Sequence, residues 1–123
     1  MLVLIPVHNE EENIGSVLGQ MALRRIQDMA DILVINDASS DASAQEIRKW
    51  PVHMLTNMER MGYGTSLQIG YRYAIDNGYR YVIQMDGDGQ HDACNIPPVF
   101  QRLREKGDGG EHPDLVLASR FME

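Results

Sequence analysis

The feature that most constrains the fold of this chain is an alternation between short, continuous apolar runs and longer segments of helical period. Five such apolar runs are found, at residues 2–7, 31–36, 52–56, 81–85 and 115–119. Strands that read as unbroken apolar runs are typical of parallel sheets buried on both faces, with helices as the crossovers. We therefore predict an α/β protein with a doubly wound, mainly parallel sheet, arranged as an α/β/α sandwich.

The segments between the runs carry helix signals. One predicted helical face has apolar residues at i, i+3, i+4 and i+7, formed by Ile14, Val17, Leu18 and Met21. The Ser39-Ser40-Asp41 turn is suited to cap a second helix that runs to about Trp50. A third helix is expected over residues 66–77, closed by Gly78, and a fourth is expected between Asn95 and Gly107.

Composition limits the class of protein. With 123 residues, 43% of them hydrophobic and 24% charged, the chain is predicted to be a single globular domain. A formal net charge of −7 argues against nucleic acid as a partner. The longest apolar run, Met1 to Val7, is too short to span a bilayer and lacks the features of a signal peptide. Cys94 is the single cysteine, so a reducing, cytoplasmic setting is expected.

Polar clusters follow three of the predicted strands. Asp86 and Asp88 lie in the sequence DGDGQHD, directly after the fourth apolar run, and acidic loops at residues 6–12 and 36–41 follow the first two. In a parallel sheet these loops share the carboxyl edge, where ligands bind. Paired carboxylates suit a hard divalent cation that carries phosphates. Helix N-termini also favour acidic residues, which is an alternative explanation for Glu11, Glu12 and Asp41.

Other motif readings fail on spacing. An EF-hand starting at Asp86 would need glycine at its sixth position and glutamate at its twelfth, where the chain has His91 and Pro97. The chain has neither a phosphate-binding loop with a Lys-Ser or Lys-Thr pair nor a G-x-G-x-x-G after the first strand. Gly62 and Gly64 are interpreted as turn glycines that permit positive φ or close backbone approach.

Taken together, these loops resemble the nucleotide-sugar half of the glycosyltransferase family 2 catalytic domain, which has the GT-A fold. Members similar to dolichyl-phosphate or polyprenyl-phosphate sugar synthases match best. The motifs that carry the resemblance are IPVHNEE at residues 5–11, VINDASSD at 34–41, GYG at 62–64, YVIQMDGDGQHD at 81–92 and ASRF at 118–121. Asn36 stands where many members carry a first acid, and Ala38 stands where glycine is frequent.

The resemblance implies a donor site on this chain. The nucleotide-sugar-binding residues would be Pro6, His8, Glu10, Asp37, Asp86, Gln90 and Arg120, and the metal ligands would be Asp88 and Asp86. Asp37 would accept hydrogen bonds from the base, and Arg120 would contact phosphate oxygens. The cofactor would be Mg²⁺ or Mn²⁺, which stabilises the charge that develops on the leaving diphosphate.

The implied reaction is inverting transfer of a sugar from a UDP- or GDP-sugar to an acceptor such as a polyprenyl or dolichyl phosphate. Residues 1–123 would form one domain, the nucleotide-sugar-binding portion of a GT-A domain truncated at its C-terminus, so no catalytic base is assigned. Two alternatives stay open: a donor-binding fragment without turnover, and a protein similar to the sugar nucleotidyltransferases. A homodimer and a peripheral position on the cytoplasmic face of a membrane are further expectations.

Overall fold

The computed structural model describes residues 1–23, 25–85 and 116–118. Within these residues the chain forms a five-stranded sheet in the order β3-β2-β1-β4-β5, and every neighbouring pair is parallel. The strands are β1 (Leu2–Val7), β2 (Asp31–Asn36), β3 (His53–Thr56), β4 (Tyr81–Gln84) and β5 (Val116–Ala118). The predicted parallel α/β sheet is therefore confirmed.

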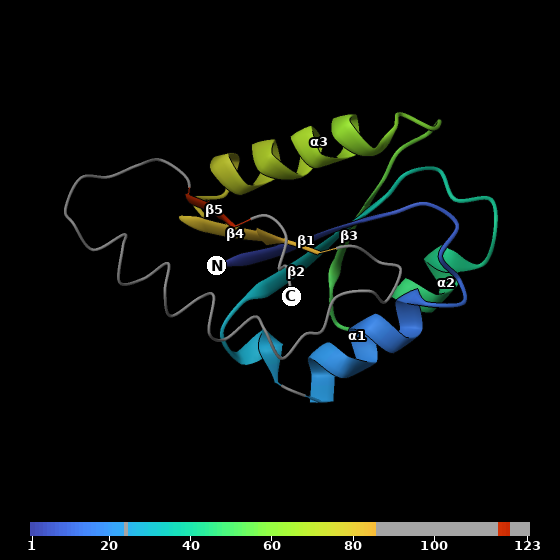
Figure 1. Cartoon of the computed structure of the whole chain (residues 1–123), viewed down its shortest axis with the longest axis horizontal. Coiled ribbons are helices and arrows are strands. Elements are labelled where there is room, and N and C mark those ends of the chain that lie inside the picture. The colour runs from blue at the N-terminus through green and yellow to red at the C-terminus, as the bar shows by residue number, and fades with distance from the viewer. Residues whose placement is uncertain (24, 86–115, 119–123) are drawn as a thin grey trace.

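Helices cover both faces of the sheet. The α1 helix (Ile14–Leu23), a short 3₁₀ helix η1 (Ile26–Asp28) and the α2 helix (Ser43–Ile47) lie on one face, and the α3 helix (Tyr63–Asp76) lies on the other (Figure 1). The helix α3 packs on β1 and β2, while α1 contacts α2 and η1. This three-layer arrangement is the predicted doubly wound sandwich. No helix in the part of the chain described here is long and apolar enough to cross a membrane.

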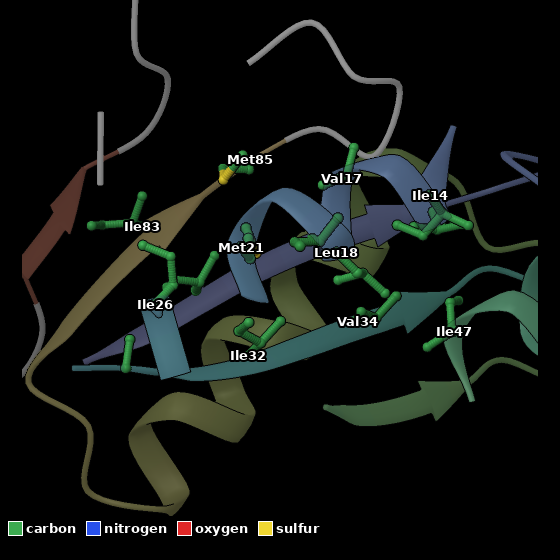
Figure 2. Close-up of a cluster of buried hydrophobic side chains, with 14 of the residues drawn as sticks. Ile14, Val17, Leu18, Met21, Ile26, Ile32, Val34, Ile47, Ile83 and Met85 are labelled. Atoms are coloured by element: carbon green, nitrogen blue, oxygen red, sulfur yellow. The ribbon is translucent and has the colours of Figure 1, made fainter. Parts of the chain in front are cut away.

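The central strand β1 explains why its sequence is an unbroken apolar run. Because successive side chains of a strand point to opposite faces, Val3 and Ile5 join the apolar cluster on the α1 side, while Leu2 and Leu4 join the cluster beneath α3. Figure 2 shows the first cluster, in which all four residues of the predicted α1 face are buried. Both faces of the strand are therefore core, and each excludes polar residues.

Two helix boundaries differ from the prediction. The helix α2 ends at Ile47, before the expected end at Trp50, because the Lys49 and Trp50 N–H groups bond to carbonyls three residues back, and Pro51 has no N–H to continue the helix. The helix α3 begins at Tyr63, so Gly64 lies inside the helix and is not the turn glycine that was expected. Only Gly62 of that pair has positive φ, at 97°.

The end of α3 follows the prediction. Gly78 adopts a φ of 77°, its N–H bonds to the Ile75 carbonyl, and the Tyr79 N–H bonds to the Ala74 carbonyl. This pair of hydrogen bonds is the Schellman motif, which glycine favours at a helix end. The helix expected between Asn95 and Gly107 lies outside the described residues.

Candidate functional site

The order of the strands predicts a ligand crevice beside the carboxyl ends of β1 and β4. From β1 the chain moves outward through β2 to β3, and α3 then carries it back to β4 on the opposite side of β1. In doubly wound sheets, ligands bind at the carboxyl ends of the strands where the direction of winding reverses. Here the last β1–β4 register pair is Leu4 with Gln84, and the Met85 N–H donates to the Leu4 carbonyl at 2.9 Å.

Pro6 helps to end the pairing of β1 with β4. Alternate residues of a central parallel strand direct their backbone groups to opposite neighbours, and Leu4 directs its carbonyl to Met85. Pro6 is two residues further along, so it faces the same side, and it has no N–H to continue a ladder. The buried Pro6 therefore lies where β1 pairs with β2 and no longer with β4.

The loops that follow β1 and β2 run side by side and are hydrogen-bonded to each other. The Asn9 N–H donates to Ser39 Oγ at 3.0 Å, and the Ser40 N–H donates to Asn9 Oδ1 at 2.8 Å. Asn9 and Ala38, each two residues beyond its strand, both adopt left-handed backbone with φ of 55° and 53°. The two loops thus leave the sheet in matching conformations.

The same two loops cap each other's helices. The Ala42 N–H at the start of α2 donates to Glu11 Oε1 at 2.8 Å, and the Glu11 N–H before α1 donates to Asp41 Oδ2 at 3.2 Å. The Glu10 N–H donates to Ser43 Oγ, whose hydroxyl donates to Asp41 Oδ1. The capping role predicted for Asp41 is found, although it also extends to the neighbouring loop. Glu11 and Asp41 are therefore engaged in holding helix N-termini.

His8 connects the first loop to the end of β2. Its Nδ1–H donates to the backbone carbonyl of Asp37 at 2.7 Å. A carbonyl only accepts, so Nδ1 carries the proton and a neutral ring retains Nε2 as an acceptor. The nearby Glu10 carboxylate accepts a hydrogen bond from Asn13 at 3.2 Å. Both His8 and Glu10 are half-buried.

The carboxylate of Asp37 is buried and accepts three hydrogen bonds. Its side chain belongs to a residue that is only 3% exposed. The Asn57 Nδ2 and the Met61 N–H donate to Oδ1 at 2.9 and 2.7 Å, and the Gly62 N–H donates to Oδ2 at 2.9 Å. Arg60 Nε lies 3.9 Å from Oδ2 on a side chain that is 63% exposed.

These contacts lower the pKa of Asp37. Burial alone raises the pKa of this carboxyl, but the hydrogen bonds from Met61, Asn57 and Gly62 and the charge of Arg60 outweigh it and favour the ionised form. The surrounding loop therefore stabilises the ionised form of the Asp37 carboxylate.

Four of the residues expected in the donor site meet at this edge of the sheet, namely Pro6, His8, Glu10 and Asp37. The others, Asp86, Asp88, Gln90 and Arg120, lie outside the described residues. Across residues 1–23, 25–85 and 116–118, no three acidic, histidine or cysteine side chains converge in a way that could hold a metal.

Sequence reasoning expected a turn at Gly62 but assigned none of residues 57–62, the loop after β3, to the site. Thr56, Asn57, Met58, Glu59 and Met61 line an open hollow of about 690 Å³. Two of the donors to Asp37 are backbone N–H groups, which every residue except proline possesses. The available signal was Gly62, which the sequence identified as a turn glycine and which adopts positive φ in the structure.

Comparison with known proteins agrees with the resemblance. The model of glycosyl transferase family 2 matches residues 2–119. Polyprenol monophosphomannose synthase of Mycolicibacterium smegmatis is 31% identical over 98% of this chain and 45% of its own length. An uncharacterised protein of Methanocaldococcus jannaschii is 30% identical over 85% of this chain and 47% of its own length. The chain thus spans about half the length of the curated relatives it matches.

A solved structure gives the same fold. A mannosyltransferase from Pyrobaculum calidifontis, in complex with GDP-Man and Mn²⁺, superposes with a TM-score of 0.54 at 23% identity, over 59% of this chain and 24% of that one. The likeness supports a Rossmann-like α/β arrangement of the GT-A type. With a family match that covers nearly the whole sequence, the chain belongs to glycosyl transferase family 2.

Proposed function

We propose that this chain binds the nucleotide-sugar donor of a metal-dependent, inverting glycosyltransferase. The observation that carries the proposal is the convergence of the β1 and β2 loops, with Pro6, His8 and Asp37, beside the crevice at which β4 ends. Membership of family 2 favours glycosyl transfer over nucleotidyl transfer.

For the donor we propose GDP-mannose in preference to a UDP-sugar. Two comparisons support this choice, because one relative is named as a phosphomannose synthase and the solved mannosyltransferase holds GDP-Man. The residues proposed to bind it are Pro6, His8, Glu10, Asp37, Asp86, Gln90 and Arg120.

The proposed cofactor is Mn²⁺ or Mg²⁺, held by Asp86 and Asp88. Their carboxylates are hard oxygen ligands that fit either ion, and they follow Met85 at the end of β4 in the sequence. When bound, such a cation offsets the negative charge that develops on the departing diphosphate. It also compensates for the net charge of −7, which would otherwise repel a phosphorylated donor.

For the acceptor we propose a polyprenyl phosphate, in line with the name of the mycobacterial relative. A phosphate oxygen is already ionised at neutral pH, so direct displacement at the anomeric carbon requires no strong protein base. An acceptor of this kind would bring the protein to the cytoplasmic face of a membrane. The homodimer expected from the sequence is retained as part of this proposal.

The metal assignment is tested by thermal unfolding with GDP, UDP and Mn²⁺. We expect GDP with Mn²⁺ to raise the Tm, UDP to raise it less, and Asp88→Ala to abolish the shift. Asp76→Ala is the matched control, since Asp76 is exposed on α3 and pairs with Arg72. An Asp88→Ala protein that keeps the full shift would overturn the metal assignment.

Turnover is tested separately, with labelled GDP-mannose and a polyprenyl phosphate in detergent. Mannosylated lipid formed by residues 1–123 would establish the activity. Donor binding without product would instead support the second candidate function, a donor-binding unit that does not turn over by itself. The observation that favours this candidate is that the chain spans 45% and 47% of its two relatives.

A further inference from the structure

Three of the hydrogen bonds that fix the loop of residues 57–62 end on one carboxylate. Asn57, Met61 and Gly62 each donate to Asp37, while Met58 at the tip of the loop is fully exposed. The loop is also joined to the sheet by the Asn57 N–H, which donates to the Asn36 carbonyl at 2.9 Å. The path of the loop therefore depends on two consecutive residues at the end of β2.

Asp37 also links this loop to the one that follows β1. Its N–H donates to the Val7 carbonyl at 2.8 Å, and its own carbonyl accepts from His8. The backbone of Asp37 thus fixes the β1 side of the site, and its side chain fixes the β3 side. A single residue holds the three loops in register with one another.

We infer that Asp37 is a positioning residue: its carboxylate holds the loop of residues 57–62, and with it the hollow beside the carboxyl edge, in the form that accepts the donor. This inference rests on the proposed function. It goes beyond the role that the family resemblance implies, in which the carboxylate accepts hydrogen bonds from the base, because it adds a role through the loop.

The accessibility of the carboxylate supports this assignment. An ionised carboxylate has about four acceptor positions, and the loop occupies three of those on Asp37. The residue is 3% exposed, so the remaining position offers little surface to a ligand. The hollow, in contrast, is lined by the loop itself, including Asn57 and Met61.

Asp37→Asn tests the inference, because it changes one oxygen into an N–H₂ group. Met61 donates to one oxygen and Gly62 to the other, so either orientation of the amide leaves one backbone N–H facing a donor. We expect hydrogen exchange at the Met61 or Gly62 amide to rise about tenfold or more, since hydrogen bonds to charged groups are the strong ones. The Leu33 and Val34 amides of β2 should change much less. Affinity for GDP with Mn²⁺ should fall in parallel.

Two further variants separate the possible roles. Asn57→Ala removes one hydrogen bond to Asp37 and leaves the carboxylate in place. We expect it to raise exchange at Met61 and Gly62 and to weaken GDP binding, though less than Asp37→Asn does. Asp76→Asn makes the same chemical change at an exposed ion pair on α3 and should alter neither measurement.

Two results would overturn the inference. Loss of GDP affinity in Asp37→Asn with unchanged exchange at Met61 and Gly62 would mean that Asp37 acts only by direct contact with the nucleotide and not through the loop. Faster exchange with unchanged affinity would mean that the loop is not needed for binding. A wild-type protein that binds no nucleoside diphosphate would contradict the proposed function, while the exchange measurement, made without nucleotide, would still report whether Asp37 holds the loop.

Discussion

A buried carboxylate such as that of Asp37 stabilises a fold only while it is ionised. Its partners are all donors, so a proton on the side chain would displace at least one of them. The loop of residues 57–62 is consequently held by a charge, and its stability has a pH dependence of predictable sign.

We predict that Asp37 contributes stability above about pH 4, the ordinary pKa of aspartate, and that this contribution is lost as the pH falls through its lowered folded pKa. The sign follows because the unfolded chain binds the proton more readily than the folded one. Urea unfolding of wild type and Asp37→Asn measures the effect: their free energies of unfolding should differ clearly at pH 7, and the difference should shrink as the pH falls below about 4.

Asp41 also has a lowered pKa, since the hydrogen bonds from Ser43 and Glu11 outweigh the effect of its burial. Asp37→Asn should therefore keep part of the acid sensitivity of the wild type. A gap between the two proteins that stays constant from pH 7 to pH 3 would contradict the assignment to Asp37.

Some features of individual residues could be anticipated from the sequence, and others could not. Ala38 stands where glycine is frequent in the family, and its φ of 53° supplies the physical reason, since glycine adopts that backbone without strain. The pairing of Glu11 with Ala42 has no such signal, because it joins residues 31 positions apart.

At the scale of elements, the approach of α3 to the sheet depends on Gly70. A Cβ built on Gly70 would lie 2.3 Å from Leu4 Cδ1 and 2.9 Å from Leu4 Cγ. Leu4 is fully buried in the central strand, so it has little room to move away. A side chain at position 70 would therefore separate the helix from β1.

We predict that Gly70→Ala destabilises the protein by about 1–3 kcal/mol, the usual cost of overpacking a core. Gly64→Ala is the matched control: it lies in the same helix, a Cβ there meets nothing within 4 Å, and alanine is the better helix former. Urea unfolding measures both. Equal stability of the two variants would show that α3 shifts without cost, contrary to the prediction.

Strands and helices could be predicted from the sequence where buried apolar residues recur with a regular period. Their end points were harder to predict. The limits of β1 and β2 match the prediction residue for residue, because β1 is apolar throughout and the apolar run of β2 lies between Asp31 and Asn36. Helix ends depend on local contacts: α2 stops short of Trp50, and η1 carries no period long enough to detect. The start of α3 was missed because Gly64 was interpreted as part of a turn.

For the molecule as a whole, the sheet lies between two apolar layers, and the central strands contribute side chains to both of them. Trp50, the single tryptophan, packs against the cluster on the α1 side, whereas Leu33 belongs to the cluster beneath α3. The neighbours of Leu33 in β2, Ile32 and Val34, belong to the cluster on the α1 side, so adjacent residues of one strand contribute to different layers. A substitution that destabilises one layer should therefore also destabilise the other, because the two layers share the strands.

We predict that Leu33→Ala lowers stability by about 2–5 kcal/mol and moves the Trp50 fluorescence transition and the far-UV circular dichroism transition together. Leu23→Ala removes the same atoms from a side chain that is 81% exposed, so its effect should stay within about 0.5 kcal/mol. A fluorescence midpoint that stays at the wild-type value in Leu33→Ala would mean that the layers unfold separately.

The candidate site was predictable in position but only partly in its contacts. Strand order follows from connectivity, and parallel strands bring their carboxyl ends together, so Pro6, His8 and Asp37 were expected at one edge. The hydrogen bonds that immobilise Asp37 come from backbone groups brought close by the whole fold. No local pattern encodes such proximity.

The reciprocal caps of α1 and α2 limit how this protein can be recombined. Each of the first two strand–helix units borrows a carboxylate from the other to start its helix, through Glu11 and Asp41. A chimera that takes the first unit from one relative and the second from another would break both caps unless both acids are retained. These two units therefore have to be inherited, grafted or redesigned as a pair.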